Sequence, residues 1–151
     1  MKTITEEQEI FLNKYTLGTW KLNPKNGLVD VDGDFNCSNK GLSDFLGIEF
    51  GRVSVNFYCS NNQLGSLEGA PQEVWDHFNC SNNQLVSLEG APQEVGGNFY
   101  CYDNNLVSLE GAPKKVGRAF VCDPLPLRGC PDNLLDDLFF LIIKNIIYII
   151  Y

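Results

Sequence analysis

The amino-acid sequence predicts a repeat solenoid, in which about five coils stack into a short parallel β-sheet. The motif Phe-x-Cys recurs at steps of 22, 21, 21 and 21 residues, starting at Phe35, Phe57, Phe78, Phe99 and Phe120. Three copies are nearly identical over a longer stretch: FYCSNNQLGSLEGAPQEV, FNCSNNQLVSLEGAPQEV and FYCYDNNLVSLEGAPKKV. Phe and Cys alternate with polar residues, which is the periodicity of a β-strand. Each coil is therefore expected to contribute one short strand.

Two columns of repeated side chains are expected to hold the coils together. Phe and Cys of each strand point inward, and the cysteines then form a column of reduced, buried thiols. These are Cys37, Cys59, Cys80, Cys101 and Cys122. Five residues after Phe in the three closest copies, an Asn turns the chain and can bond to the backbone of the neighbouring coil. These asparagines are Asn62, Asn83 and Asn104, and we expect them to form a structural ladder.

The spacing within one coil carries a resemblance to a known family. Taking Phe as position zero, Cys falls at +2, Asn at +5 and Leu at +7 and +10, which are the offsets of the leucine-rich pattern L-x-L-x-x-N-x-L. The segment SNNQLVSL resembles the repeats of bacterial leucine-rich effector proteins. The unit LEGAP-x-x-V-x-x-x-F-x-CSNNQL resembles short leucine-rich repeat proteins of bacteria and their phages. The resemblance covers residues 28–130 and implies a leucine-rich-repeat solenoid, but it brings no common activity with it.

The N-terminal segment, residues 1–31, is expected to cap the solenoid, which then spans residues 32–130. Residues 5–8 read Thr-Glu-Glu-Gln, the pattern of a helix capping box. Ile10, Phe11 and Tyr15 provide the apolar side of a short helix. Residues 19–22 and 28–31 are predicted to pair as a hairpin around the turn at residues 23–27.

The C-terminal segment, residues 131–151, is predicted to form an apolar helix that caps the last coil. Its run LFFLIIKNIIYIIY, residues 138–151, is apolar at all but two positions. As a helix it would span about 21 Å, which is short of a bilayer core of about 30 Å. Self-association through the excess apolar face and contact with a membrane remain alternatives for this segment.

Composition narrows the classes of partner. The formal net charge is −8 and the sequence pI is about 4.5. Proteins that bind nucleic acid directly usually carry a basic face, and the only basic cluster here is Lys114, Lys115 and Arg118. The charge instead suits a basic partner or mimicry of nucleic acid. The first ten residues, MKTITEEQEI, lack the apolar run of a signal peptide, so we expect a cytoplasmic protein.

No motif predicts catalysis, a cofactor or a metal site. The acidic segment at residues 30–34, DVDGD, resembles a calcium loop, but an EF-hand needs Gly at its sixth place, where Phe35 stands. His77 is the only histidine, and no nucleophile is paired with it in the sequence. Cys130 lies outside the column of thiols and could pair with Cys122 in an oxidising compartment, although a reduced thiol is the expectation.

Residues that differ between near-identical coils point to a binding face. Positions −1, +1 and +3 relative to Phe should project outward, and they carry Tyr, Asn and Ser, which suit rigid yet adaptable recognition. The candidate partner-binding residues at these positions are Asn56, Tyr58, His77, Asn79, Asn98, Tyr100 and Tyr102. Trp75 is a further candidate, because its equivalents in other coils are the small residues Ser54, Gly96 and Gly117.

These observations predict a non-enzymatic module that binds a protein partner on the exposed strand face. One alternative is an acidic nucleic-acid mimic that inhibits a nucleic-acid-handling protein, motivated by the net charge. Another is a membrane-associated or self-assembling protein that acts through residues 138–151.

Overall fold

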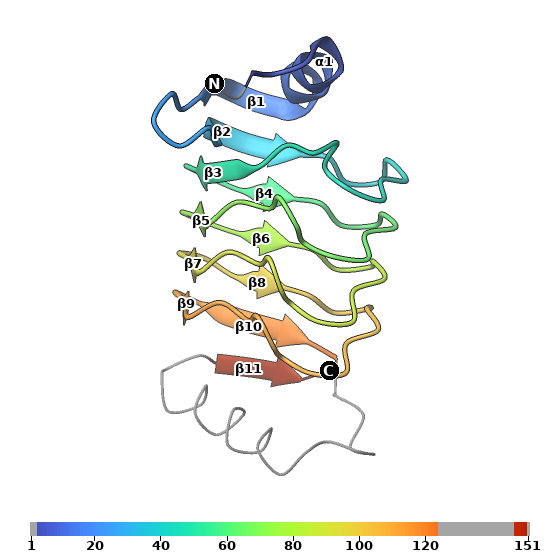
Figure 1. Ribbon diagram of the computed structural model, residues 1–151. Helices are drawn as coiled ribbons and strands as arrows, with labels where there is room; N and C mark the ends of the chain where they lie inside the picture. The colour runs from blue at the N-terminus through green and yellow to red at the C-terminus, as the bar shows by residue number, and fades with distance from the viewer. Residues whose placement is uncertain (1–2, 124–146, 151) are drawn as a thin grey trace.

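The computed structural model describes residues 3–123 and 147–150, which form a parallel β-solenoid of about four turns with a period of about 21 residues. The predicted fold class is therefore confirmed. Figure 1 shows the coils stacked from the N-terminal cap, α1 and β1, to β10 and β11 at the opposite end.

Two columns of strands run along the solenoid, where the sequence predicted one. The first column contains the Phe-x-Cys motifs: β2 (Val29–Asn36), β4 (Phe57–Tyr58), β6 (Phe78–Asn79), β8 (Phe99–Tyr100) and β10 (Ala119–Cys122). The second column lies on the returning half of each coil: β3 (Phe50–Val53), β5 (Glu73–Val74), β7 (Glu94–Val95) and β9 (Lys115–Val116). All neighbours within both columns are parallel. Strand β2 joins the columns, because it pairs with both β3 and β4.

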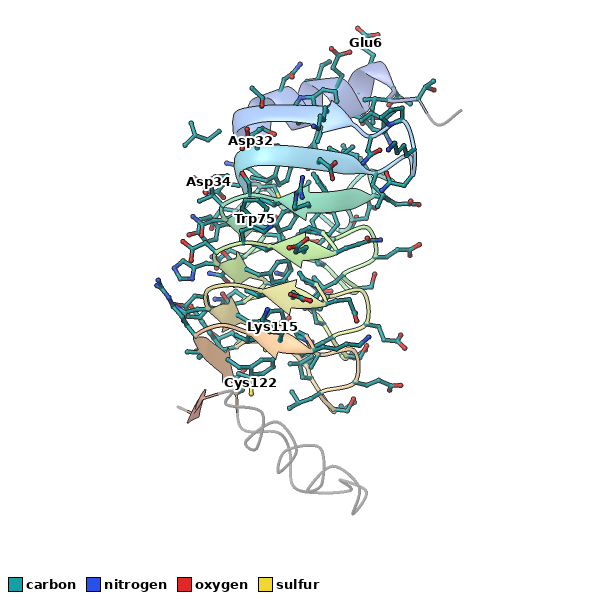
Figure 2. The ribbon with its side chains drawn as sticks, turned by 90° about the vertical axis from the view of Figure 1, so that its left-hand side faces the viewer. Glu6, Asp32, Asp34, Trp75, Lys115 and Cys122 are labelled. Atoms are coloured by element: carbon teal, nitrogen blue, oxygen red, sulfur yellow. The ribbon has the colours of Figure 1, made fainter. Side chains whose placement is uncertain are left out.

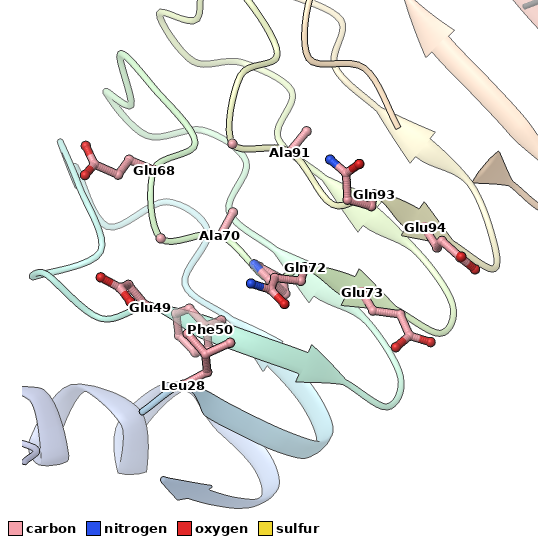
Figure 3. Close-up of a pocket in the computed structure, with 13 residues that line it drawn as sticks. Leu28, Glu49, Phe50, Glu68, Ala70, Gln72, Glu73, Ala91, Gln93 and Glu94 are labelled. Carbon is pink, nitrogen blue, oxygen red and sulfur yellow. The ribbon is translucent and has the colours of Figure 1, made fainter. Parts of the chain in front are cut away.

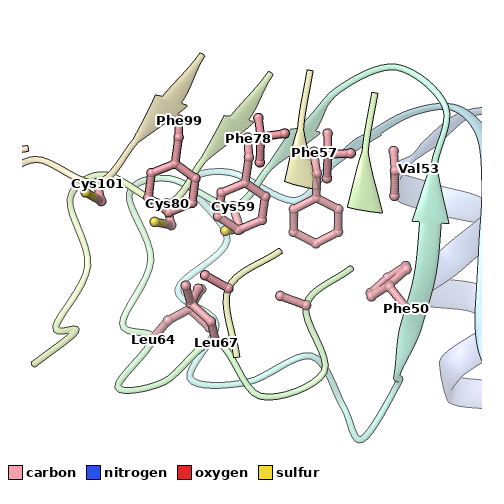
Figure 4. Close-up of a cluster of buried hydrophobic side chains, with 14 of the residues drawn as sticks. Phe50, Val53, Phe57, Cys59, Leu64, Leu67, Phe78, Cys80, Phe99 and Cys101 are labelled. Atoms are coloured by element: carbon pink, nitrogen blue, oxygen red, sulfur yellow. The ribbon is translucent and has the colours of Figure 1, made fainter. Parts of the chain in front are cut away.

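The core is a stack of phenylalanine rings at the centre of the coils (Figure 4). The rings of Phe57 and Phe78 lie 5.5 Å apart at 6°, and those of Phe78 and Phe99 lie 5.3 Å apart at 8°. These distances follow from the spacing of about 4.8 Å between paired strands. One Val from each strand of the second column and two Leu from each of the central coils close the other sides, and all are buried: Val53, Val74, Val95, Val116, Leu64, Leu67, Leu85 and Leu88.

The N-terminal cap contains the predicted helix, α1 (Glu6–Tyr15), which begins with the full capping box between Thr5 and Gln8. Phe11 is buried and its ring lies 5.7 Å from that of Phe35, so the helix continues the aromatic stack. The expectation for Ile10 is wrong: its side chain is 60% exposed, and Leu12 is buried instead. The buried face of this short helix runs through residues 11, 12 and 15, and position 10 falls outside it.

The predicted hairpin is also present, and it is longer than expected. Strand β1 (Thr16–Leu22) pairs antiparallel with β2 over seven residue pairs, including Gly18 opposite Gly33. Both glycines have positive φ, 134° and 130°. A Cβ on Gly33 would lie 2.1 Å from the carbonyl oxygen of Leu17, so only glycine allows the two strands to approach this closely.

The C-terminal helix predicted for residues 131–151 is wrong for Ile147–Ile150, which form the strand β11. This strand lies parallel to β10, with Ala119 opposite Ile147 and Cys122 opposite Ile150. The physical reason is that isoleucine and tyrosine favour strands, and the end of the parallel sheet at β10 accepts one further strand. Residues 131–146, residue 151 and Cys130 lie outside the described residues.

Candidate binding face

The predicted face lies on the outer side of the first strand column, where Tyr58, Asn79 and Tyr100 occupy the +1 position of successive coils. Their registers bring them side by side: Tyr58 is opposite Asn79 in β6, and Asn79 is opposite Tyr100 in β8. All three side chains are partly exposed. The fold therefore assembles three of the candidate residues into one row.

The three candidates at position −1 have a different environment, because they bind the backbone of the next coil. The backbone N–H groups of Asn56, His77, Asn98 and Ala119 donate in turn to Oδ1 of Asp34 (3.0 Å), Oδ1 of Asn56 (2.9 Å), Nδ1 of His77 (2.8 Å) and Oδ1 of Asn98 (3.0 Å). We call Asp34, Asn56, His77 and Asn98 the outer ladder. Their acceptor atoms point along the solenoid toward the next coil. These side chains therefore hold neighbouring coils together, and their acceptors are already engaged within the protein.

Sequence reasoning missed the outer ladder. Its members are one aspartate, two asparagines and one histidine, so no single residue type marks the ladder in the sequence. They share a side-chain acceptor at the same distance from the backbone, which Asp, Asn and the Nδ1 atom of His all provide. The recurrence of such an acceptor every 21 or 22 residues is the signal that could have revealed it.

Hydrogen bonds between coils also account for two carboxylates of the calcium-like segment at residues 30–34. Oδ1 of Asp30 accepts from the backbone N–H of Arg52 at 3.1 Å, and Oδ1 of Asp34 also accepts from Nδ2 of Asn56 at 2.8 Å. These carboxylates therefore join coils. Across residues 3–123 and 147–150, no group of three or more His, Cys, Asp or Glu side chains could hold a metal ion.

An aromatic cluster forms at the C-terminal half of the face. The ring of Tyr100 lies 6.3 Å from that of His77 and 6.4 Å from that of Tyr102, to which it is nearly perpendicular. The hydroxyl of Tyr100 accepts a hydrogen bond from Nδ2 of Asn98 at 2.8 Å, which fixes the ring. Tyr100 and Tyr102 line a cavity of about 670 Å³ together with Asn98, Asp103, Asp123 and residues of β10. A partner side chain could enter there.

Tyr58 lies on the same face, in the coil before that of Asn79. Partial burial, followed by the negative charges of Asp34 and Asp76, raises the pKa of its phenol. The phenol of Tyr58 is therefore neutral at neutral pH. We call Tyr58, Tyr100 and Tyr102 the tyrosine face.

The asparagine ladder lies at the turn after each strand of the first column. Nδ2 of Asn83 donates to the carbonyls of Cys59 (3.1 Å) and Cys80 (3.0 Å), and its Oδ1 accepts from the backbone N–H of Leu64 at 3.0 Å. Each amide therefore binds its own coil and the coil before it. Asn62 and Asn104 make the equivalent bonds.

The cysteine column consists of free, buried thiols at residues 37, 59, 80, 101 and 122. The thiols of Cys59 and Cys80 donate to the carbonyls of Asn79 (3.4 Å) and Tyr100 (3.3 Å) in the following coil. Burial raises the pKa of the Cys37 thiol to about 12 and raises those of Cys59, Cys80 and Cys101 as well. A hydrogen bond from the Cys101 side chain lowers the pKa of Cys122, which is less buried. The four inner thiols are therefore protonated at neutral pH and serve as packing.

Trp75 lies at the corner between the two strand columns, away from the row of tyrosines, and is 54% exposed. The guanidinium of Arg52 stacks on its ring at 5.2 Å, and its indole N–H donates to Oε1 of Glu73 at 3.0 Å. Figure 2 labels Trp75 together with Asp32 of the neighbouring hairpin. The fold does not place Trp75 within the tyrosine face.

A groove of about 750 Å³ runs along the returning half of the coils (Figure 3). Glu49, Glu68, Glu73 and Glu94 line it, and Ala70 and Ala91 lie in its floor. Glutamates also recur at equivalent positions of the three closest copies, at residues 68, 89 and 110, and of these only Glu68 lines the groove. The groove shows that part of the negative charge of the chain gathers on the side opposite to the phenylalanine strands.

Comparison of the chain with protein-family models, curated proteins and solved structures finds no match. Within residues 3–123 and 147–150, no helix is long and apolar enough to cross a membrane. The class of protein that the fold defines is therefore a short parallel β-solenoid with a repeat of about 21 residues.

Proposed function

We propose that this protein is a non-enzymatic module, of leucine-rich-repeat type, that binds a protein partner on the tyrosine face. The observation that carries the proposal is the row of partly exposed side chains at position +1, which ends in the aromatic cluster of Tyr100 and Tyr102 beside a cavity of about 670 Å³. Tyrosine loses little conformational entropy on binding and buries a large area, and it is enriched among residues that dominate binding energy.

Rigidity of the face supports the proposal. The outer ladder ties each coil to the next beside the row of tyrosines, and the bond from Asn98 holds the Tyr100 ring in place. A face that is already ordered loses less freedom when a partner docks. The candidates Asn56, His77 and Asn98 then act as supports, and Tyr58, Tyr100 and Tyr102 act as contacts, with Asn79 between them.

A capture experiment from a bacterial lysate, with three forms of the full-length protein, tests this function. The first form is wild type, and the second carries Tyr58→Ala, Tyr100→Ala and Tyr102→Ala. The third carries Val86→Ala and Val107→Ala, which remove exposed apolar side chains from another part of the coils. A partner retained by the first and third forms but lost by the second, at low and at high salt, is the expected result.

Two other outcomes contradict the proposal. A partner that binds all three forms and leaves at high salt favours acidic mimicry of nucleic acid, because only exposed charge interactions are strongly screened. Loss of solubility or assembly of the full-length protein without any partner favours the self-assembly hypothesis. Sedimentation of the wild-type protein alone distinguishes that case.

A further inference from the structure

Three residues that depart from the repeat line the cavity of about 670 Å³ beside Tyr100. Tyr102 stands at position +3 of its coil, where the two preceding coils carry serine. Asp103 follows it, where those coils carry asparagine, and Asp123 takes the serine position of the next coil. The residues at these positions in the two preceding coils are Ser60, Asn61, Ser81 and Asn82. Changes between near-identical coils therefore converge on one cavity.

Strand geometry places the side chains of this cavity on one side of the sheet. Phe99 in β8 is in register with Phe120 in β10, and both are buried in the aromatic stack. Positions +1 and +3 of both coils point away from that stack, because side chains alternate along a strand. Tyr100, Tyr102 and Asp123 therefore project from the same outer face.

The fold fixes the orientation of the rings and of one carboxylate. Tyr100 and Tyr102 line the cavity with their rings at 85° to each other. Oδ2 of Asp123 accepts a hydrogen bond from the backbone N–H of Asp103. In the preceding coil the equivalent N–H, that of Asn82, donates to the backbone carbonyl of Tyr102 at 3.0 Å. The Asp123 carboxylate thus replaces a backbone acceptor and is held against the coil that carries the two tyrosines.

Aromatic rings and carboxylates in one cavity favour a cation. The face of an aromatic ring attracts positive charge, and the carboxylates of Asp103 and Asp123 attract it as well. Among the described residues that line the cavity, none is a lysine or an arginine. The negative charge of this wall is therefore not balanced by a cation of the wall itself.

Elsewhere the chain supplies cations to its own aromatic rings. The guanidinium of Arg52 lies 5.2 Å from the centre of the Trp75 ring. The ammonium of Lys40 lies 5.7 Å from the centre of the Tyr15 ring. Within residues 3–123 and 147–150, neither tyrosine of the cavity has a cation over its ring. The cavity therefore matches a cation that another molecule brings.

We propose that this cavity binds an arginine side chain of the protein partner, an inference that rests on the proposed function. The planar guanidinium stacks on a tyrosine ring, and its N–H groups donate to the carboxylates of Asp103 and Asp123. A guanidinium is more weakly hydrated than an ammonium, so it loses less hydration on entering. An enclosed cation is also screened by salt less than an exposed one, which agrees with the retention at high salt expected above.

Titration of the isotope-labelled, full-length protein with two short peptides tests the proposal by NMR. The probe is acetyl-Gly-Arg-Gly amide, and its control carries citrulline, which keeps the shape of arginine but has no charge. At constant ionic strength, the arginine peptide should give saturable shifts of the Tyr102 and Asp103 amide signals with a millimolar dissociation constant. The citrulline peptide should bind at least about tenfold more weakly. Equal binding of the two peptides, or no saturable shift with the arginine peptide at tens of millimolar, overturns the proposal.

Two double variants show whether the peptide binds in this cavity. Asp103→Asn restores the residue type of the preceding coils, and Asp123→Asn keeps an acceptor for the N–H of residue 103. Together they should weaken binding of the arginine peptide about tenfold. Glu68→Gln with Glu89→Gln removes the same amount of charge from the returning half of the coils and should leave binding unchanged. Circular dichroism checks that both variants fold. Equal weakening in both, or none in the aspartate variant, contradicts the proposal.

The capture experiment described above separates failure of this inference from failure of the proposed function. Both the triple tyrosine variant and the double aspartate variant should lose the partner. Loss from the tyrosine variant alone leaves the proposed function intact and contradicts the binding of an arginine. Retention by every variant contradicts the proposed function itself.

Discussion

Nδ1 of His77 accepts a hydrogen bond from the backbone N–H of Asn98 at 2.8 Å, and it does so at the position where Asn56 presents its amide oxygen one coil earlier. Only an unprotonated ring nitrogen can accept such a bond, so the neutral imidazole is the form that fits. The single histidine of the chain is thus one member of a structural series. Nothing about this contact requires imidazole chemistry.

Replacing His77 with asparagine should therefore be tolerated. His77→Asn preserves an acceptor at this position and is expected to change the free energy of unfolding by less than about 0.5 kcal/mol. His77→Ala leaves the N–H of Asn98 without its protein acceptor and should cost about 1 kcal/mol. Urea denaturation of both variants measures the difference. Equal destabilisation by the two substitutions would contradict a role as an acceptor.

Asn83 should be the most sensitive member of the asparagine ladder, because it is the only one that is buried. Asn83→Ala removes bonds to Cys59, Cys80 and Leu64 together and leaves buried backbone groups unpaired. We expect a loss of about 3 kcal/mol. Asn105→Ala is the control, since its side chain is exposed on the adjacent turn. If the two variants have the same midpoint in urea, the ladder does not stabilise the stack.

The close approach of Gly18 and Gly33 predicts that alanine disrupts the hairpin at position 33. The uncrowded Gly65 serves as the comparison, because alanine should be tolerated there. Gly33→Ala places a methyl group 2.1 Å from the carbonyl oxygen of Leu17 at a positive φ, and it should unfold or separate the hairpin. Gly65→Ala meets no atom within 4 Å and should be neutral or stabilise by up to about 1 kcal/mol. Thermal unfolding of the two variants compares them. An unchanged melting temperature for Gly33→Ala would show that β1 can shift away from β2.

Alkaline pH should destabilise the protein through its buried thiols. Burial raises the pKa of Cys59 and Cys80 in the folded state, whereas in the unfolded chain these thiols ionise near their ordinary pKa of 9.0. Above pH 9 the unfolded state therefore holds fewer protons, and stability falls as pH rises, by about 1.4 kcal/mol per pH unit for each such thiol. Below pH 9 this contribution is fully present and constant.

The comparison of wild type with Cys80→Ala isolates this effect from other groups that titrate in the same range. Free energies of unfolding are measured in urea between pH 8 and pH 10.5. Below pH 9 the two proteins should show similar slopes, and above pH 9 the free energy should fall less steeply for the variant, by up to about 1.4 kcal/mol per pH unit. Identical slopes would mean that the Cys80 thiol ionises within the folded protein.

Much of the fold follows from regular spacing. The Phe-x-Cys repeat predicts the first strand column and the aromatic stack, because a strand places alternate side chains on one face. The second column was not predicted, since strands such as Glu73–Val74 bury only one residue per coil and lack any visible alternation. The strand at Ile147–Ile150 was missed for another reason. An apolar run without alternation fits a helix or a strand equally well, and the edge of β10 decides between them.

The candidate site was predicted in part. Projection outward at positions −1, +1 and +3 follows from strand geometry, and Tyr58, Tyr100 and Tyr102 lie on that face. The sequence does not show which outward side chains bend back to bind their own backbone, as His77 and Asn98 do. Nor does it show that Trp75 lies apart from these tyrosines, because the corner at which it stands is set by the second strand column, which was not predicted.

The reversed direction of β1 has a consequence for growth of the stack. The strand edge at the end of a parallel solenoid has the same hydrogen-bonding pattern as the edges between its coils. Without a cap, such an edge can pair with a second molecule, and repeated pairing would give a fibre. At the N-terminal end, β1 runs antiparallel to β2 and is followed outward by α1. A second molecule that arrived there would meet a strand of opposite polarity and a helix. The hairpin and the helix therefore prevent another molecule from adding a parallel coil at the N-terminal end.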